Sequence, residues 1–207
     1  NEDIDMLKPA LAKMCSMGRT LEEVQLKALG AMALKLYKEY GRELTITGLR
    51  DAFKTGSMPE LGLNGDQRVK DLAVMLNPYT RDGEYARFFE GRNNIDFSND
   101  FMVIENEELK RKPELHSVVN ILLFYQITRE MYLTRERRKL VLVDEAWELL
   151  RGVATGEFLE AGYRRARKYN GAFITGTQSI EDYTKSPAAN AALENADWVF
   201  MLRQKPE

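Results

Sequence analysis

The sequence contains few of the residues that build zinc sites and disulfides. Its 207 residues include one cysteine, Cys15, and one histidine, His116. A single thiol cannot form an internal disulfide, and this usage is typical of a reducing compartment such as the cytoplasm. A dedicated zinc site needs a cluster of cysteine or histidine ligands, which the sequence does not offer. A domain held by internal disulfides is therefore excluded, and a zinc enzyme gains no support.

The chain also lacks an excess of positive charge and a long apolar run. It carries 30 Lys and Arg against 32 Asp and Glu, a formal net charge of -2. Domains that grip nucleic acid usually carry a clear basic excess, so direct DNA binding is not expected. The apolar run at 121–125 is far short of the ~20 residues that span a bilayer, and the start is not signal-like. Any membrane association would therefore depend on partners.

Residues 1–92 have the pattern of an all-helical lobe. Thr20 and Glu23 form a capping-box pattern, which predicts a helix that begins after Thr20 and ends at Gly41. Asp66 predicts the start of another helix. Turns rich in Gly, Pro and Asn separate these segments, and the lobe shows no alternating strand pattern.

Residues 93–207 change character and alternate apolar strand-like runs with helical segments. Long helical stretches are predicted at 113–134 and 146–168. Alternation of strand and helix is typical of an α/β fold with a mostly parallel sheet and covering helices. The predicted strands are 101–105, 139–143, 172–176 and 196–202.

Two carboxylates follow directly on the second of these strands. In a parallel sheet, ligands bind at the carboxyl ends of the strands, and Asp144 and Glu145 lie at such an end. Nucleoside triphosphatases use this order, with the Asp holding Mg²⁺ and the Glu positioning or deprotonating the attacking water. A strand that ends in solvated acids capping the next helix would look similar, and this alternative stays open.

The next strand ends in small and amide side chains at the same edge. Thr177 and Gln178 follow it, and a glutamine there can sense a γ-phosphate or orient water. The alternative is a hydrogen-bonded turn that enters the next helix.

A cationic cluster lies between these two strands. Arg164, Arg165, Arg167 and Lys168 would suit a solvated helix end, a nucleic-acid patch or, in an oligomeric nucleotidase, an arginine that reaches the phosphates of a neighbouring subunit. That last interpretation assumes that the arginine lies on the side of the sheet that carries the carboxylates. The arginines at 135–138 enter at the opposite, amino end of the sheet and are interpreted as surface residues.

These motifs, in this order, make the whole chain resemble the large ATPase family that powers type IV secretion in bacteria, including its members from F-type conjugative plasmids. The resemblance rests on LVLVDEAW (140–147), RRARKYNG (164–171), TGTQS (175–179) and NADWVFML (195–202). It implies a RecA-like α/β lobe with an inserted all-α lobe. It also implies a homo-oligomer, such as a hexamer, peripheral to the cytoplasmic side of the inner membrane.

The resemblance also implies roles for single residues, with ATP and Mg²⁺ as the ligands. Asp144 would hold Mg²⁺, Glu145 would be the catalytic glutamate, and Gln178 would sense the phosphate, with Thr177 in the nucleotide site. Arg167 is the best match to an arginine that acts in trans, and Arg164 is the second candidate. Expected partners are other type IV secretion and pilus assembly proteins and the coupling ATPase.

One element of the family is missing from these residues. No G-x-x-x-x-G-K-[ST] phosphate loop occurs in the sequence. In the family this loop lies upstream of the helical lobe, so the chain is expected to be a C-terminal fragment that neither binds ATP tightly nor hydrolyses it alone. Two alternatives remain, a DNA-translocating coupling ATPase of the same fold and a non-catalytic protein-docking module.

Overall fold

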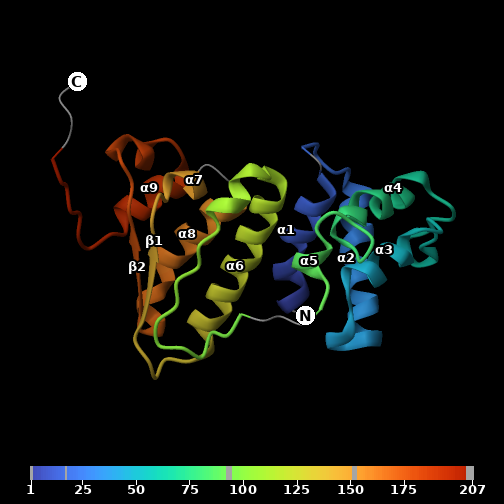
Figure 1. Ribbon diagram of the computed structural model, residues 1–207, viewed down its shortest axis with the longest axis horizontal. Coiled ribbons are helices and arrows are strands. Elements are labelled where there is room, and N and C mark those ends of the chain that lie inside the picture. The colour runs from blue at the N-terminus through green and yellow to red at the C-terminus, as the bar shows by residue number, and fades with distance from the viewer. Residues whose placement is uncertain (1, 17, 92–94, 151–152, 204–207) are drawn as a thin grey trace. The chain divides into compact units, whose positions relative to one another are not determined.

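A computed structural model describes residues 2–16, 18–91, 95–150 and 153–203. Within them a run of helices is followed by two short strands with helices between and after them (Figure 1). By contacts between residues the chain divides into two compact units, residues 1–122 and 123–207. The helices and strands, in chain order, are α1 (Glu2–Ser16), α2 (Glu23–Tyr40), α3 (Ile46–Phe53), α4 (Gln67–Leu76), α5 (Ala86–Phe89), α6 (Pro113–Leu133), β1 (Lys139–Val143), α7 (Trp147–Leu150), α8 (Val153–Arg165), β2 (Gly171–Thr175) and α9 (Pro187–Glu194).

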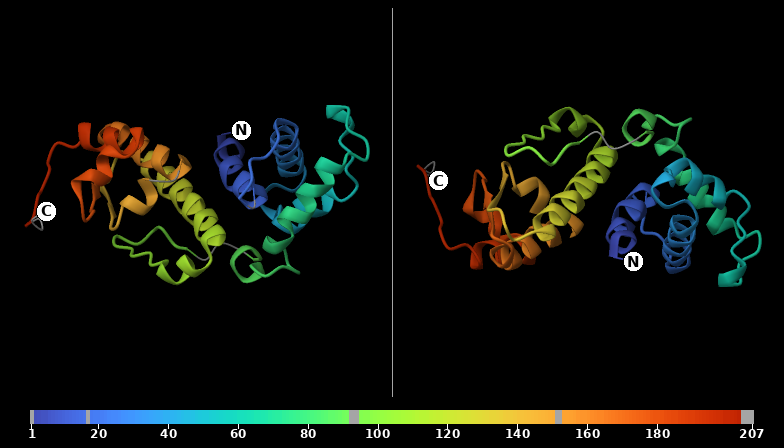
Figure 2. Two further views of the ribbon diagram at one scale, coloured as in Figure 1. Left: turned by 90° about the horizontal axis from the view of Figure 1, so that it is seen from above. Right: turned by 90° about the horizontal axis from the view of Figure 1, so that it is seen from below.

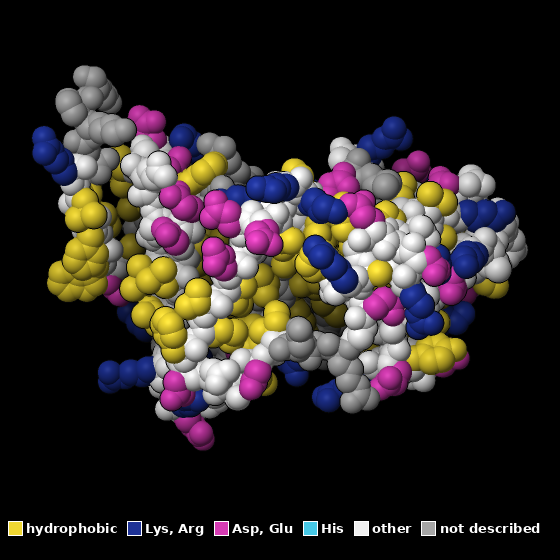
Figure 3. Space-filling view, viewed as in Figure 1, with side chains coloured by type: hydrophobic (Ala, Val, Ile, Leu, Met, Phe, Trp, Pro, Cys, Tyr) yellow, Lys and Arg dark blue, Asp and Glu magenta, His cyan; other side chains and the backbone are white. Residues whose placement is uncertain are grey.

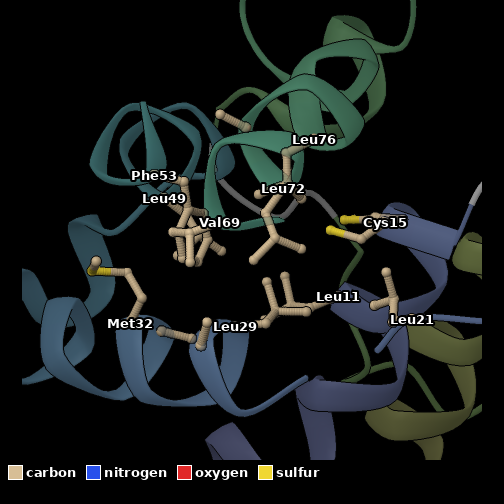
Figure 4. Close-up of a cluster of buried hydrophobic side chains, with 14 of the residues drawn as sticks. Leu11, Cys15, Leu21, Leu29, Met32, Leu49, Phe53, Val69, Leu72 and Leu76 are labelled. Atoms are coloured by element: carbon tan, nitrogen blue, oxygen red, sulfur yellow. The ribbon is translucent and has the colours of Figure 1, made fainter. Parts of the chain in front are cut away.

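The first unit is built around one helical core. Apolar faces of α1 to α4 meet there, and Phe53, Leu29 and Leu72 are among its fully buried side chains (Figure 4). Each such side chain contributes about 1.5–3 kcal/mol relative to an exposed one. Cys15 belongs to this core, and burial raises the pKa of its thiol to about 12.

Of the two helix start positions predicted in this unit, the structure agrees with one. Asp66 caps α4 as predicted, since its Oδ1 accepts the Arg68 backbone N–H at 2.9 Å. The prediction for Thr20 was wrong, because α2 begins at Glu23 with Glu22 as its cap, and the Gln25 side chain accepts the Glu22 backbone N–H at 3.1 Å. Leu21 is buried ahead of the helix, which leaves the first turn to start two residues later.

The second unit contains a two-stranded parallel sheet. β1 pairs with β2 in the register Lys139 to Gly171 through Val143 to Thr175, so both strands end at the same edge. The strand predicted at 139–143 and the long helix α6 agree with the sequence. The predicted mostly parallel α/β architecture is therefore present in the described residues, with a small and incomplete sheet.

Helix α8 covers one face of this sheet. Phe158 of α8 meets Phe173 of β2 edge-on at 5.8 Å between ring centroids and stacks on Phe124 of α6 at 4.3 Å. A side chain at Gly162 would come within 2.6 Å of the Phe173 ring, so the close approach of helix and strand depends on glycine there. The opposite face exposes Leu140, Leu142 and Ile174.

Two predicted strands are absent from the described structure. Residues 101–105 and 196–202 are irregular and pair with no other strand among the described residues. Phe101 and Phe200 are 84% and 85% exposed. The segment that ends the described chain extends away from the helices of its unit (Figure 2) and displays hydrophobic side chains at the left of Figure 3. A strand requires a hydrogen-bonding neighbour as well as an apolar sequence, and these segments have none within the described residues.

The boundary predicted between residues 92 and 93 lies outside the described residues and stays a prediction. The two compact units divide within α6, after Leu122. Within the described residues, no helix is both long enough and apolar enough to cross a membrane.

Candidate active site

The carboxyl edge of the sheet carries the candidate site. Beyond the last paired residues, the Gly176 backbone N–H donates to the Val143 carbonyl at 2.9 Å, and the Ala146 N–H donates to the Gly176 carbonyl at 2.9 Å. These two bonds carry the pairing past both strand ends. They hold the Asp144–Glu145 turn against the segment that follows β2.

Asp144 lies exposed at this edge. Its Oδ1 accepts the Glu145 backbone N–H at 2.9 Å, which orients the carboxylate. Gly176 lies against it, since a Cβ at position 176 would come within 3.3 Å of Asp144 Oδ1. The absence of a side chain at Gly176 leaves room beside the carboxylate.

Glu145 is held by both of its carboxylate oxygens. Trp147 Nε1 donates to Oε2 at 2.6 Å, and Gln178 Nε2 donates to Oε1 at 2.8 Å. The backbone of Glu145 has φ 49°, in the left-handed region that residues other than glycine rarely adopt. Such strain clusters at functional sites and costs of order 1 kcal/mol.

Gln178 connects the two strand ends. It lies on the loop after β2, is exposed, and reaches the glutamate that follows β1. Thr177 points its hydroxyl elsewhere, donating from Oγ1 to Asp182 Oδ2 at 2.6 Å, while Lys185 pairs with the other Asp182 oxygen at 2.8 Å. The Thr177 side chain therefore stabilises the turn that presents Gln178.

A network of three hydroxyl groups supports the last residue of β2. Thr175 Oγ1 lies 2.7 Å from the Tyr163 hydroxyl and 2.7 Å from the Tyr183 hydroxyl. Burial raises the pKa of Tyr163 further above neutral pH, so its hydroxyl keeps a proton to donate. These contacts fix the strand end from which Gln178 departs.

The donor set at this edge suits Mg²⁺ bound together with a phosphate. Among the described residues, no group of three or more His, Cys, Asp or Glu side chains could hold a metal by itself. Mg²⁺ commonly takes one or two carboxylates and completes its octahedron with water and phosphate oxygens. Asp144, exposed beside Gly176, fits that mode of binding.

The candidate arginines lie away from these carboxylates. Arg167 precedes β2, within a short 3-10 helix at 166–169, and lines an open depression of about 400 Å³ at the amino ends of both strands, together with Arg138, Lys139 and Asn170. A five-residue strand separates the two edges by about 16 Å. The premise that Arg167 shares the side of Asp144 was therefore wrong, because a residue just before a strand must lie at its amino end.

Arg164, the second candidate, lies on the exposed surface of α8. Its guanidinium pairs with Glu160 one turn earlier, at 3.0 Å. The structure thus brings together Asp144, Glu145 and Gln178 of this chain, and brings neither arginine to them.

The family described as the TraG P-loop domain matches residues 52–206, well over half of the chain. The chain belongs to this family. The matched TraG P-loop range includes both strands and every candidate site residue.

Individual relatives agree with the TraG P-loop assignment. Protein TraC of Escherichia coli K12 is 36% identical over 144 residues, covering 66% of this chain and 16% of TraC. The type IV secretion system protein VirB4 of Bartonella henselae is 24% identical over 192 residues, covering 83% of this chain and 23% of VirB4. CagE of Helicobacter pylori is 26% identical over 137 residues, covering 64% of this chain and 14% of CagE. The chain thus spans less than a quarter of the length of these curated relatives.

A solved structure shows the fold of this TraG P-loop chain. VirB4 of Thermoanaerobacter pseudethanolicus superposes with a TM-score of 0.69 at 22% identity, covering 93% of this chain and 54% of that one. The predicted RecA-like α/β fold with an additional helical lobe is confirmed. The resemblance to type IV secretion proteins inferred from the motifs is confirmed as well.

Sequence reasoning missed Trp147, Asp182 and Gly176. Trp147 follows Glu145 by two residues, which signals proximity but not the indole hydrogen bond to the carboxylate. Asp182 belongs to a turn whose cap, Ser179, is readable, while its contact with Thr177 is not. The glycine between Thr175 and Thr177 was the most accessible signal, because glycine at a strand end often marks a close approach.

Proposed function

We propose that this chain is part of an ATPase motor domain that powers type IV secretion, conjugative pilus assembly and DNA transfer. The observation that carries the proposal is the hydrogen bond between Gln178 and Glu145, which joins the ends of two parallel strands at one edge. Ligands of such sheets bind at this edge. The names of the relatives, which include two type IV secretion system proteins, support the process.

In this proposal each edge residue has one role. Asp144 would hold Mg²⁺, and the ion would supply positive charge that neutralises the phosphates of ATP. Glu145 orients the attacking water and accepts its proton as the water oxygen bonds to the γ-phosphorus and ADP leaves with the bridging oxygen. Gln178 senses the γ-phosphate, with Thr177 fixing the loop that carries it.

The arginines act between subunits in this proposal. Arg167, with Arg164 as the second candidate, lies at the opposite edge from its own carboxylates, so its phosphate partner belongs to a neighbouring copy. A ring such as a hexamer, peripheral to the inner membrane on its cytoplasmic side, would bring the two edges together. Other type IV secretion and pilus assembly proteins and the coupling ATPase are the proposed partners.

The decisive experiment uses a longer form of the protein that contains a phosphate-binding loop. Glu145→Gln should abolish ATP hydrolysis and leave nucleotide binding within about twofold, because only the handling of the water is lost. Glu181→Gln, an exposed acid on the neighbouring turn, is the matched control and should keep full activity. Hydrolysis by Glu145→Gln at the wild-type rate would refute the assignment.

The 207-residue chain is proposed to be inactive alone. It has no G-x-x-x-x-G-K-[ST] loop to cradle the phosphates. Sustained ATP turnover by the isolated chain would contradict this part of the proposal.

A further inference from the structure

The two hydrogen bonds to Glu145 come from donors of different kinds. The Trp147 indole has one donor and no acceptor, and it lies at the start of α7, half-buried. Gln178 is exposed on a loop, and its amide can exchange one partner for another. The hydrogen bond from Trp147 is thus suited to hold Glu145 throughout, and the hydrogen bond from Gln178 is suited to break when a ligand binds.

We propose that Trp147 is a positioning residue that holds Oε2 of Glu145 and thereby assigns Oε1 as the oxygen that accepts the proton. This inference rests on the proposed function of Glu145 and names the residue that orients it. In the present arrangement Gln178 covers Oε1 at 2.8 Å, so the carboxylate is restrained on both sides. If Gln178 turned away to bind a γ-phosphate, the lone pair of Oε1 that now accepts from its amide would become available to the attacking water.

The indole of Trp147 suits this anchoring role. The turn holds Glu145 at φ 49°, and the indole two residues later reaches Oε2 at 2.6 Å. Charge-assisted bonds of this length are among the stronger hydrogen bonds in proteins. A phenylalanine ring would fill similar space but would supply no donor, so Oε2 would lose its hydrogen bond to the indole.

The contact is tested first by spectroscopy, which does not depend on hydrolysis. The chain has two tryptophans, and Trp198 is 79% exposed, so Trp198→Phe leaves Trp147 as the only indole. The ¹H–¹⁵N signal of its Nε1–H should lie downfield of an exposed indole. Glu145→Ala should move it to the exposed position, and Asp144→Asn, the matched control, should leave it in place. If the chemical shift of Trp147 Nε1–H is the same in Glu145→Ala and in the parent protein, the proposed contact is overturned.

The role is tested next in the longer form of the protein. Trp147 is replaced by β-(3-benzothienyl)alanine, which keeps the ring shape and puts sulfur in place of N–H. We expect kcat to fall about 10-fold with KM for ATP within about twofold, and the same replacement at Trp198 to change neither. An unchanged kcat overturns the positioning role. If Glu145→Gln still hydrolyses ATP, the proposed function fails instead, while the indole signal still decides whether Trp147 holds Glu145.

Discussion

Gly176 lies so close to Asp144 that a methyl group at position 176 would come within 3.3 Å of the Asp144 Oδ1 atom. Real Cβ atoms seldom approach an oxygen this closely, so the carboxylate would have to move by a few tenths of an ångström. The two residues follow adjacent strands and are held by the Gly176 to Val143 backbone bond at 2.9 Å. The space beside the proposed magnesium ligand is thus set by the neighbouring strand.

Gly176→Ala should therefore weaken the binding of Mg²⁺ at Asp144. In the longer protein, the Mg²⁺ concentration needed for half-maximal hydrolysis should rise severalfold while the thermal midpoint changes little. Asp144→Asn should have a much larger effect in the same titration. Equal Mg²⁺ dependence in Gly176→Ala and wild type would mean that the space between Gly176 and Asp144 is not part of the metal site.

The position of Arg167 predicts complementation between subunits. Arg167→Ala should lower hydrolysis by about 10³-fold, the usual scale for an arginine that acts on a transferring phosphoryl group. Mixing Arg167→Ala subunits with Glu145→Gln subunits should restore part of the activity, because each supplies what the other lacks. Arg138→Ala, at the same depression, is the control and should retain activity. Failure of the mixture to gain activity over either variant would exclude a role in trans.

Burial of Cys15 predicts a loss of stability at alkaline pH. Burial raises the pKa of the folded thiol from its ordinary value of 9.0 to about 12, so the unfolded chain ionises first as pH rises. The contribution is fully present below about pH 9 and falls by about 1.4 kcal/mol per pH unit up to about pH 12. The urea midpoint of unfolding should fall less between pH 8 and pH 10 in Cys15→Ala than in wild type. Rapid labelling of the native thiol by iodoacetamide would contradict the burial.

Gly83 predicts a large effect of a small substitution. A Cβ at this position would overlap the backbone carbonyl oxygens of Asn77 and Pro78, which cannot move as a side chain can. Gly83→Ala should lower the free energy of unfolding by about 1–3 kcal/mol. Gly48→Ala, whose Cβ would meet only ordinary contacts at 3.7 Å and beyond, should cost much less in the same denaturation experiment.

The parts of the fold that were predictable are those encoded locally. The strand at 139–143 and helix α6 follow from apolar runs with clear ends, and Asp66 caps its helix by a contact two residues away. The segments at 101–105 and 196–202 were predicted as strands from composition, but strand formation depends on a neighbour that the local sequence does not specify.

The candidate site was predictable in its residue types and not in its contacts. Asp144, Glu145 and Gln178 were identified because parallel strands end at one edge. The indole bond of Trp147 and the left-handed backbone of Glu145 arise from the shape of one turn, which the sequence does not reveal. Arg167 was assigned to the wrong edge although its position just before β2 was readable.

The left-handed backbone at Glu145 has a consequence for protein engineering. Glycine adopts φ 49° without the steric penalty of about 1–2 kcal/mol that a side chain incurs there, so Glu145→Gly relieves backbone strain while deleting the carboxylate. A library screened only for heat resistance would therefore enrich variants that have lost the proposed water-activating group. Any thermostabilised version of this domain needs a parallel screen for turnover at every round.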